Sequence, residues 1–413
     1  VLDSSIKLFT FAIYSRANFC ILVISFFVML ILFSKQSLLA AQNGLELFLN
    51  SVLPSIFPFL VIVNILLNLK LLKKICKLFH PITKKVFKLP GISTLPIVIG
   101  LLSGYPIGAK ISNDLYSKNL ISKNTAEKLL GFTNNSGPLF ILSYVGISLY
   151  HDVMTGILLL CTHILSAITV GIIFGIFDRK NLSRGIVDTV YEKYINEENE
   201  CNKNIKKNIS FSQIVIDSVK NSVTTILIIG GFIVFFSVVI ELLQNSNLFY
   251  ILSLPINAIL LALNLPTELT IPTLQGLIEI TNGLESLSNV SNVPYVYKVC
   301  VSAFILGIGG FSIYMQTLAI IIDNNLSTKK YLLGKFLQGI IAFIFTYLLI
   351  VYTPFFNLGA IETYVKPSVP VSTVMQTQEI NMFLDFIILC FISCVLFKMY
   401  QIKKKCFKKT KSN

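Results

Sequence analysis

The stretch that decides the fold is GLLSGYPIGAKISNDL, Gly100–Leu115. It begins like a membrane segment, is interrupted by Gly-Tyr-Pro at 104–106, and continues as a polar helix that carries Lys110 and Asp114. Unpaired backbone N–H and C=O groups are tolerated at membrane depth only inside protein or beside a water-filled cavity. We therefore predict a helical hairpin that turns back inside the membrane. The alternative is a kinked spanning helix that packs closely through a Gly-x-x-x-Gly pair.

The composition places the chain in a membrane. Its 413 residues are 54% hydrophobic and 13% charged, and the mean hydropathy is +0.76. Soluble globular domains carry roughly 25% charged residues, so an integral membrane protein is indicated. Much of the net charge of +14 comes from lysines beside apolar segments, seven between 70 and 88 and seven between 398 and 411. This pattern is typical of contact with a lipid bilayer, and no nucleic-acid partner is expected.

Eight runs are apolar and long enough to cross a bilayer, which takes about 17–25 residues. These candidate spans are residues 17–33, 51–69, 131–149, 152–177, 221–243, 296–320, 336–353 and 380–400. The first is interpreted as a retained helix, because no small-x-small cleavage site follows it. Residues 70–90 alternate lysines with apolar residues, as in a helix that lies in the membrane interface. Residues 91–111 and 266–290 are interrupted by polar residues, Pro and Gly, and are not counted as spans.

With eight crossings, both termini lie in the cytoplasm, and the lysine distribution agrees with this topology. The basic segments 70–90, 329–330 and 398–411 fall inside, whereas 266–297 falls outside and contains three glutamates without Lys or Arg. This follows the positive-inside rule. Residues 178–209 mix seven basic with six acidic residues and are too polar for a core, which predicts a cytoplasmic linker.

The two halves of the chain on either side of this linker repeat. NSVLPSIF at Asn50 resembles NSVTTILI at Asn221, LPIVIGLLSGYPIG at Leu95 aligns with IPTLQGLIEITNG at Ile271, and NNSGPLFIL aligns with GIGGFSIYM. The offsets stay near 171–176 residues. Three crossings between equivalent points would give the halves opposite orientations, which is a common architecture of transporters.

The sequence therefore predicts an all-α polytopic membrane protein of about eight transmembrane helices plus two re-entrant hairpins in an inverted repeat. Its predicted parts are an N-terminal transmembrane helix (1–40), a first repeat (41–177), the linker (178–209), a second repeat (210–355), and a C-terminal transmembrane helix with a basic tail (356–413).

Polar residues at the two breaks of the first half are candidate binding groups. Ser103, Gly104 and Tyr105 lie at the first break, and Lys110 follows on the polar helix. At the second break, FTNNSGPLF, four small or amide-bearing residues precede Pro138: Asn134, Asn135, Ser136 and Gly137. Proline at a helix start leaves the preceding N–H groups free, and the helix dipole favours an anion there. The alternative is a polar loop that caps a spanning helix.

The second half contributes the other candidate groups. LIEITNG places Glu279, Thr281 and Asn282 in an apolar setting, and GIGGFSIYMQ adds a glycine-rich break and Gln316. An ionisable residue inside a membrane segment is costly and is a functional hypothesis by default. Glu279 is thus the candidate for coupling to a proton or cation, and the alternative places it in a loop exposed to water. We expect these residues to face those of the first half across a substrate site.

The sequence gives no sign of catalytic chemistry. Its eight cysteines and three histidines form no C-x-x-C pair and no Cys/His cluster, so no metal site is expected. No nucleophile–base pair and no G-x-x-x-x-G-K-[ST] motif is present. We therefore predict that the protein is not an enzyme, has no catalytic residue and needs no cofactor.

Four motifs in this order, SGYPIGAK, NNSGPLFI, EITNG and GIGGFSIYMQ, resemble the YlbJ family of sporulation integral membrane proteins, also called SpoVV. That family belongs with the nucleoside-recognition (Gate) domain proteins, so the two repeats are Gate-like. The resemblance runs from about residue 40 to 355. Two positions depart from the family pattern: the family usually has a bulkier residue than Ile308 in the glycine-rich motif, and a histidine near the position of Tyr314.

The resemblance implies a protein of endospore-forming bacteria, located in the outer forespore membrane, that the spore cortex requires and that moves dipicolinic acid towards the forespore. A small organic anion such as dipicolinate suits half-helix N-termini, amide side chains and a lysine. We therefore expect a secondary transporter in which one repeat rocks against the other. Other sporulation membrane proteins are expected partners, and a homo-oligomer is left open. The alternatives are transport of a nucleoside-like solute and a non-transporting scaffold for spore-envelope assembly.

Overall fold

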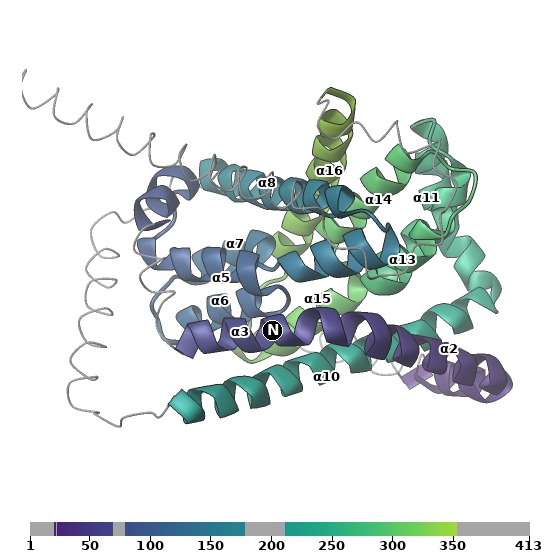
Figure 1. Cartoon of the computed structure of the whole chain (residues 1–413), viewed down its shortest axis with the longest axis horizontal. Coiled ribbons are helices and arrows are strands. Elements are labelled where there is room, and N and C mark those ends of the chain that lie inside the picture. The colour runs from purple at the N-terminus through teal and green to yellow at the C-terminus, as the bar shows by residue number, and fades with distance from the viewer. Residues whose placement is uncertain (1–19, 22, 69–78, 178–210, 353–413) are drawn as a thin grey trace, which may run out of the picture. The chain divides into compact units, whose positions relative to one another are not determined.

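The computed structural model describes residues 20–68 apart from residue 22, 79–177 and 211–352 (Figure 1). The regular structure of this part of the chain is entirely helical, which confirms the predicted all-α class. The predicted linker 178–209, the candidate span 380–400 and the basic tail lie outside the described residues, as does the first part of the segment 70–90.

Four helical stretches are long and apolar enough to cross a membrane: Val153–Ile176, Phe211–Gln244, Tyr295–Asn324 and Lys329–Tyr352. They overlap four of the predicted spans. Two bent pairs raise the number to six if each pair is one span: Val23–Leu32 with Ser34–Val52, bent by 97°, and Phe79–Phe87 with Gly91–Ser103, bent by 108°. The chain is thus an integral membrane protein. Because the count covers the described residues only, the total of eight crossings stays a prediction.

The first long helix is built from three consecutive elements, α2 (Ser34–Leu47), the π-helical η1 (Phe48–Val52) and α3 (Leu53–Asn68). The 34-residue helix α10 (Phe211–Gln244) lies alongside them (Figure 1). A glycine on each side permits the close approach, since Gly44 faces Ser237 and Gly230 faces the ring of Phe48. A helix from the second half of the sequence therefore packs directly on the first half.

The predicted interruption at Gly104 is present and forms a helical hairpin. Helix α5 (Thr94–Ser103) ends there, and α6 (Ile107–Ser117) begins after the Gly-Tyr-Pro turn. The two helices pack against each other through Gly100 and Gly108, because a Cβ on Gly100 would lie 3.2 Å from the Cα of Gly108. Two short elements precede this first hairpin: η2 (Thr83–Phe87) and η3 (Gly91–Ser93).

A second helical hairpin lies at the predicted interruption in 266–290. Helices α12 (Thr270–Ile278) and α13 (Ile280–Ser288) meet at Glu279 and pack on each other. Two glycines again form the contact, since a Cβ on Gly283 would lie 2.1 Å from the Cα of Gly276. This second hairpin is preceded by α11 (Asn247–Ala262) and η5 (Thr267–Leu269).

Each half also contains a second broken helix. In the first half, α7 (Lys123–Thr133) is followed by non-helical Asn134–Gly137, by a helix start at Pro138 with η4 (Phe140–Leu149), and then by α8 (Val153–Phe177). In the second half, α14 (Tyr295–Ile308) breaks at Gly309 before α15 (Gly310–Ile321), η6 (Ile322–Asn324) and α16 (Lys329–Tyr352).

The candidate span 131–149 is therefore not one continuous helix. In a continuous helix the N–H of residue 138 would donate to the carbonyl oxygen of Asn134, but Pro138 has no N–H and its ring would clash with that carbonyl. Asn134 accordingly adopts an extended conformation, with φ −89° and ψ 92°.

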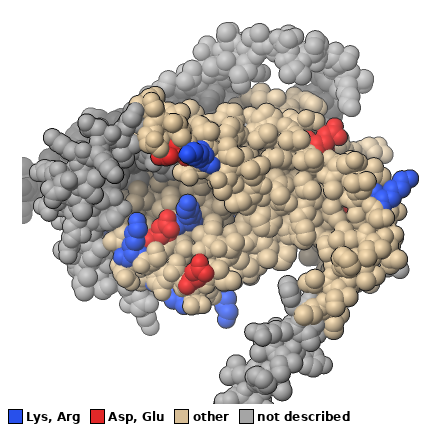
Figure 2. All heavy atoms as spheres, turned by 90° about the horizontal axis from the view of Figure 1, so that it is seen from below, with Lys and Arg blue, Asp and Glu red and all other residues tan. Residues whose placement is uncertain are grey.

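The outer surface of the helices is apolar. Large side chains on α10 and α16 are strongly exposed, among them Leu227 at 61% and Phe336 at 53%. In Figure 2 the charged side chains gather towards two opposite ends of the described surface, with an uncharged zone between them. Exposed apolar area on this scale marks a surface that contacts lipid or protein rather than water.

Candidate functional site

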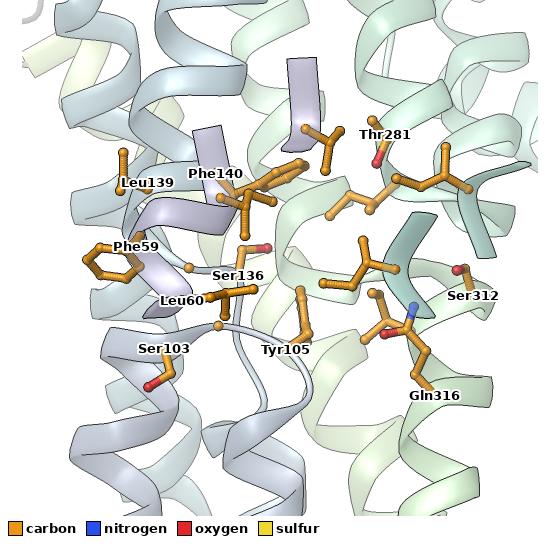
Figure 3. Close-up of a pocket in the computed structure, with 18 of the residues that line it drawn as sticks. Phe59, Leu60, Ser103, Tyr105, Ser136, Leu139, Phe140, Thr281, Ser312 and Gln316 are labelled. Carbon is orange, nitrogen blue, oxygen red and sulfur yellow. The ribbon is translucent and has the colours of Figure 1, made fainter. Parts of the chain in front are cut away.

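Three of the four helix breaks, together with α15, which follows the fourth, line a cavity. Its volume of about 60 Å³ exceeds the roughly 10–15 Å³ that one water molecule needs, so the space is larger than a packing defect. Apolar side chains of α3 and α10 form part of the wall, including Leu60 and Ile233. The polar lining comes from the breaks and from α15 (Figure 3): Ser103, Gly104, Tyr105, Ser136, Gly137, Glu279, Thr281, Ser312 and Gln316.

The two breaks of the first half touch each other at this cavity. Gly104 has φ +77°, a conformation that glycine adopts without the steric penalty of a Cβ. A Cβ at this position would also lie 2.8 Å from the backbone nitrogen of Gly137. Glycine at 104 therefore satisfies two requirements, the backbone conformation of the turn and the contact with the second break.

The two breaks of the second half make the same kind of contact. Gly309 and Gly310 have φ +83° and +73°, and a Cβ on Gly310 would lie 2.9 Å from the carbonyl oxygen of Gly276 in the second hairpin. The α14–α15 break is therefore held against the α12–α13 turn.

Tyr105 joins the breaks of the two halves. Its hydroxyl donates to the carbonyl oxygen of Leu306, 3.3 Å away at the end of α14. The same hydroxyl lies 2.8 Å from where a Cβ on Gly309 would stand. Tyr105 therefore bridges the cavity region from the first hairpin to the α14–α15 break.

Glu279 is a buried acid at the turn of the second hairpin, with 2% of its surface exposed. Its carboxylate accepts hydrogen bonds from the backbone nitrogen of Asn282 at 2.8 Å, from Asn282 Nδ2 at 3.0 Å and from the hydroxyl of Thr281 at 3.2 Å. It thereby caps the N-terminus of α13, where the helix dipole favours a negative charge. Asn282 is held in turn by Ser237 of α10, since its Nδ2 lies 3.0 Å from that hydroxyl.

Asn134 and Asn135 lie just behind the cavity wall, fully buried, and bind residues of the second half. Asn134 Nδ2 donates to the hydroxyl of Thr317 at 2.9 Å, and the Asn134 carbonyl accepts from Lys335 Nζ at 2.8 Å. Gln338 Nε2 donates to Asn135 Oδ1 at 2.9 Å. These contacts hold the extended segment in place.

His163 of α8 supports the same segment, because its Nε2 accepts a hydrogen bond from the backbone nitrogen of Ser136 at 3.2 Å. The histidine is 2% exposed. An Nε2 that accepts a hydrogen bond carries no proton, so the neutral ring holds its proton on Nδ1.

The structure brings most of the predicted site residues together. Eight line the cavity: Ser103, Gly104, Tyr105, Ser136, Gly137, Glu279, Thr281 and Gln316. Asn134, Asn135 and Asn282 lie in contact with its wall, as described above. Lys110 lies on the exposed face of α6 and is not part of the lining.

Sequence reasoning missed Ser312, His163, Lys335 and Gln338. Lys335 and Gln338 carried a signal, because polar residues three positions apart share a helix face with Tyr331 and Ala342, which are buried like them. The predicted span began at 336 and so treated Lys335 as a flanking charge.

Three buried side-chain oxygen atoms of lining residues lack hydrogen-bond partners among the described residues: Ser103 Oγ, Ser136 Oγ and Gln316 Oε1. Buried polar groups are normally paired, so these three are available to a ligand or to water. The described residues contain no group of three or more His, Cys, Asp or Glu side chains that could hold a metal ion. The site therefore offers neutral hydrogen-bonding groups and one acid.

These features define a class of protein, an integral membrane protein whose interrupted helices meet around a small, mostly apolar cavity with polar groups at the breaks. Residues 49–180 match the family described as nucleoside recognition, Gate. The chain is 32% identical over 343 residues to the "Sporulation integral membrane protein YlbJ" of Bacillus subtilis (strain 168), covering 80% of this chain and 82% of that protein. The chain therefore belongs to the YlbJ family of sporulation integral membrane proteins. No solved structure matches it.

Proposed function

We propose that the protein is a secondary transporter that moves a small organic anion, dipicolinate, across the outer forespore membrane, and that spore cortex and core maturation depend on it. The cavity carries this proposal, because it lies where interrupted helices of both halves meet. Substrate sites of secondary transporters are typically built from such discontinuous helices. The dipicolinate substrate and the forespore location rest on the family resemblance.

The proposed architecture is the inverted repeat, with eight crossings and both termini in the cytoplasm. Corresponding features support it: a hairpin closed by Gly100 and Gly108 in one half, and by Gly276 and Gly283 in the other. Each half then has one more broken helix, at Asn134–Gly137 and at Gly309. In this arrangement the two hairpins enter the membrane from opposite sides, and access to the cavity alternates between them.

The proposed binding mode follows from the lining. In Figure 3 the hydroxyl of Ser136 and the amide of Gln316 are directed towards the centre of the lining groups. Together with Ser103 they would bind polar atoms of the solute, and the apolar wall of α3 and α10 would contact its ring. Lys110, exposed on α6, would attract the anion at the cytoplasmic mouth. Glu279 would couple transport to a proton, which its hydrogen-bonded, buried position permits.

Uptake by purified protein in liposomes tests the proposal. We expect labelled dipicolinate to accumulate when a proton gradient is imposed, and not in liposomes without protein. Folded protein that takes up no dipicolinate under any gradient would contradict the proposal and favour the scaffold alternative.

A nucleoside-like solute is the second candidate, because the matched family is described as nucleoside recognition and the lining offers neutral hydroxyl and amide groups. Competition separates the two. Excess unlabelled uridine should leave dipicolinate uptake unchanged if dipicolinate is the substrate, whereas direct uptake of labelled uridine would favour the second candidate.

A further inference from the structure

Lys335 is a buried lysine that the predicted site did not include. It lies on α16 and is 2% exposed. The helix cannot easily turn it outward, since α16 packs tightly against α7 on this side: a Cβ on neighbouring Gly334 would lie 2.4 Å from the carbonyl oxygen of Gly131. A buried lysine in a membrane protein is costly and indicates a function.

The hydrogen-bond acceptors of Lys335 are neutral. Its Nζ donates to the carbonyl oxygen of Asn134 at 2.8 Å and to Gln338 Oε1 at 2.7 Å. The part of the chain that the structure describes gives it no carboxylate partner. These two bonds solvate the protonated amine without supplying a counter-charge, so the protonated form attracts an anion that occupies the neighbouring space.

That neighbouring space is the cavity. Lys335 Nζ lies 5.5 Å from the centre of the Tyr105 ring, and Tyr105 lines the cavity. Lys335 also donates to the carbonyl oxygen of Asn134, which belongs to the extended segment that supplies Ser136 and Gly137 to the same wall. One ring and one stretch of backbone thus separate the ammonium group from the solute space.

The buried acid Glu279 belongs to the second hairpin, so the two charges reach the cavity from different halves of the chain. Glu279 lines the cavity directly, with its carboxylate already bonded to Thr281 and Asn282. The amine of Lys335 lies behind the Tyr105 ring, outside the lining itself. The lining is therefore polarised, with a positive field on the Tyr105 side.

We propose that Lys335 sets the charge selectivity of the cavity and favours a small solute that directs a carboxylate group towards the Tyr105 wall. The proposal rests on the proposed transport function and assigns to Lys335 the recognition of the anion's charge inside the cavity. Lys335 acts as a positioning residue, through Tyr105 and the Asn134–Gly137 segment.

Equilibrium binding to the purified full-length chain in detergent tests the proposal without requiring transport. The probes are pyridine-2,6-dicarboxylate and its neutral diamide, which share ring and shape but differ in charge. Lys335→Gln removes the charge while keeping hydrogen-bond donors, Lys335→Arg keeps the charge, and Lys329→Gln changes an exposed lysine on the same helix as the control.

We expect wild-type protein and Lys329→Gln to prefer the dicarboxylate. Lys335→Gln should reduce that preference by roughly tenfold or more, because an unscreened charge acts strongly at this range, and Lys335→Arg should restore part of it. A merely structural role would instead weaken the binding of both probes equally.

An unchanged preference in folded Lys335→Gln protein would overturn the proposal, as would wild-type protein that binds neither probe or favours the diamide. Liposome uptake with the same proteins separates the two levels. Charge-selective binding without uptake would overturn the transport function and support the role of Lys335. Uptake with unchanged selectivity in Lys335→Gln would support the transport function and overturn the role of Lys335.

Discussion

The turns of the two hairpins differ in how the N-terminus of the second helix is capped. At the first turn, the residue that precedes α6 is Pro106, and no side chain caps the helix. At the second, the carboxylate of Glu279 caps α13. The first N–H of α6, that of Ile107, donates to the carbonyl oxygen of Gly104 at 3.2 Å, whereas the N-terminus of α13 is capped by the protein's own acid. The second turn thus carries an acid at a helix N-terminus, whereas the first turn does not.

Gly104→Ala gives the largest expected effect on this comparison. The added Cβ meets Gly137 backbone at a position with φ +77°, so the turn must shift, at a cost of about 1–3 kcal/mol in the free energy of unfolding. Dipicolinate uptake should be nearly abolished, and thermal unfolding should move to lower temperature. Gly231→Ala is the control, because a Cβ there meets nothing within 4 Å. Equal unfolding temperatures for the two variants would show that the turn is not constrained as described.

Glu279→Gln tests the capped turn. The amide oxygen can still accept from Asn282, so we expect a loss of about 1 kcal/mol in stability, while uptake should lose its dependence on the proton gradient. The matched control is Glu285→Gln on the same helix, which should keep the gradient dependence. If Glu279→Gln protein still responds fully to the gradient, Glu279 is a structural cap only.

Tyr105→Phe removes one hydrogen bond between the halves and leaves both turns intact. The variant loses the hydrogen bond to the Leu306 carbonyl, which is worth about 0.5–1.5 kcal/mol, and we expect a several-fold change in uptake rate. Tyr250→Phe, at a tyrosine that is 68% exposed, should match wild type in stopped-flow uptake. Identical rates for both variants would remove Tyr105 from the description of the site.

Lys110→Ala should give the smallest effect. Lys110 is exposed, so its attraction for an anion is screened by salt within about 10 Å at 0.1 M ionic strength. We expect a roughly two- to threefold slower uptake at low salt and no difference at high salt. A large loss that persists at high salt would place Lys110 in the binding site itself.

Much of the fold followed from local patterns. The apolar run 152–177 predicts α8 because a long apolar segment in a bilayer must pair its own backbone groups, as a helix does. The breaks at Gly104 and before Pro138 follow from the backbone chemistry of glycine and proline. The polar lining was predictable for the same reason, since polar residues beside such breaks need partners.

The site's long-range partners were not predictable in this way. Tyr105 meets Leu306, and Asn134 meets Lys335, each about 201 positions apart in sequence. Whether a lysine at a helix start faces water or a carbonyl oxygen depends on which segment packs there. Here α16 begins at Lys329, so Lys335 lies nearly two turns inside the helix, beside the α7 break.

The packing of α16 has a consequence for how the molecule can move. Along its length this helix is fastened to the first half: Lys330 pairs with Glu127 of α7 at 3.4 Å, Lys335 binds Asn134, and Thr346 donates to Thr162 of α8 at 3.0 Å. Helix α10 also packs on α2 and α3, so helices of each half pack against helices of the other half. A motion that moved one half of the sequence away from the other would have to break all of these contacts. The first hairpin adds to these contacts, since Tyr105 donates to the Leu306 carbonyl and Asn113 of α6 to the Ile320 carbonyl at 2.9 Å, so a displacement of this hairpin must exchange those bonds for others.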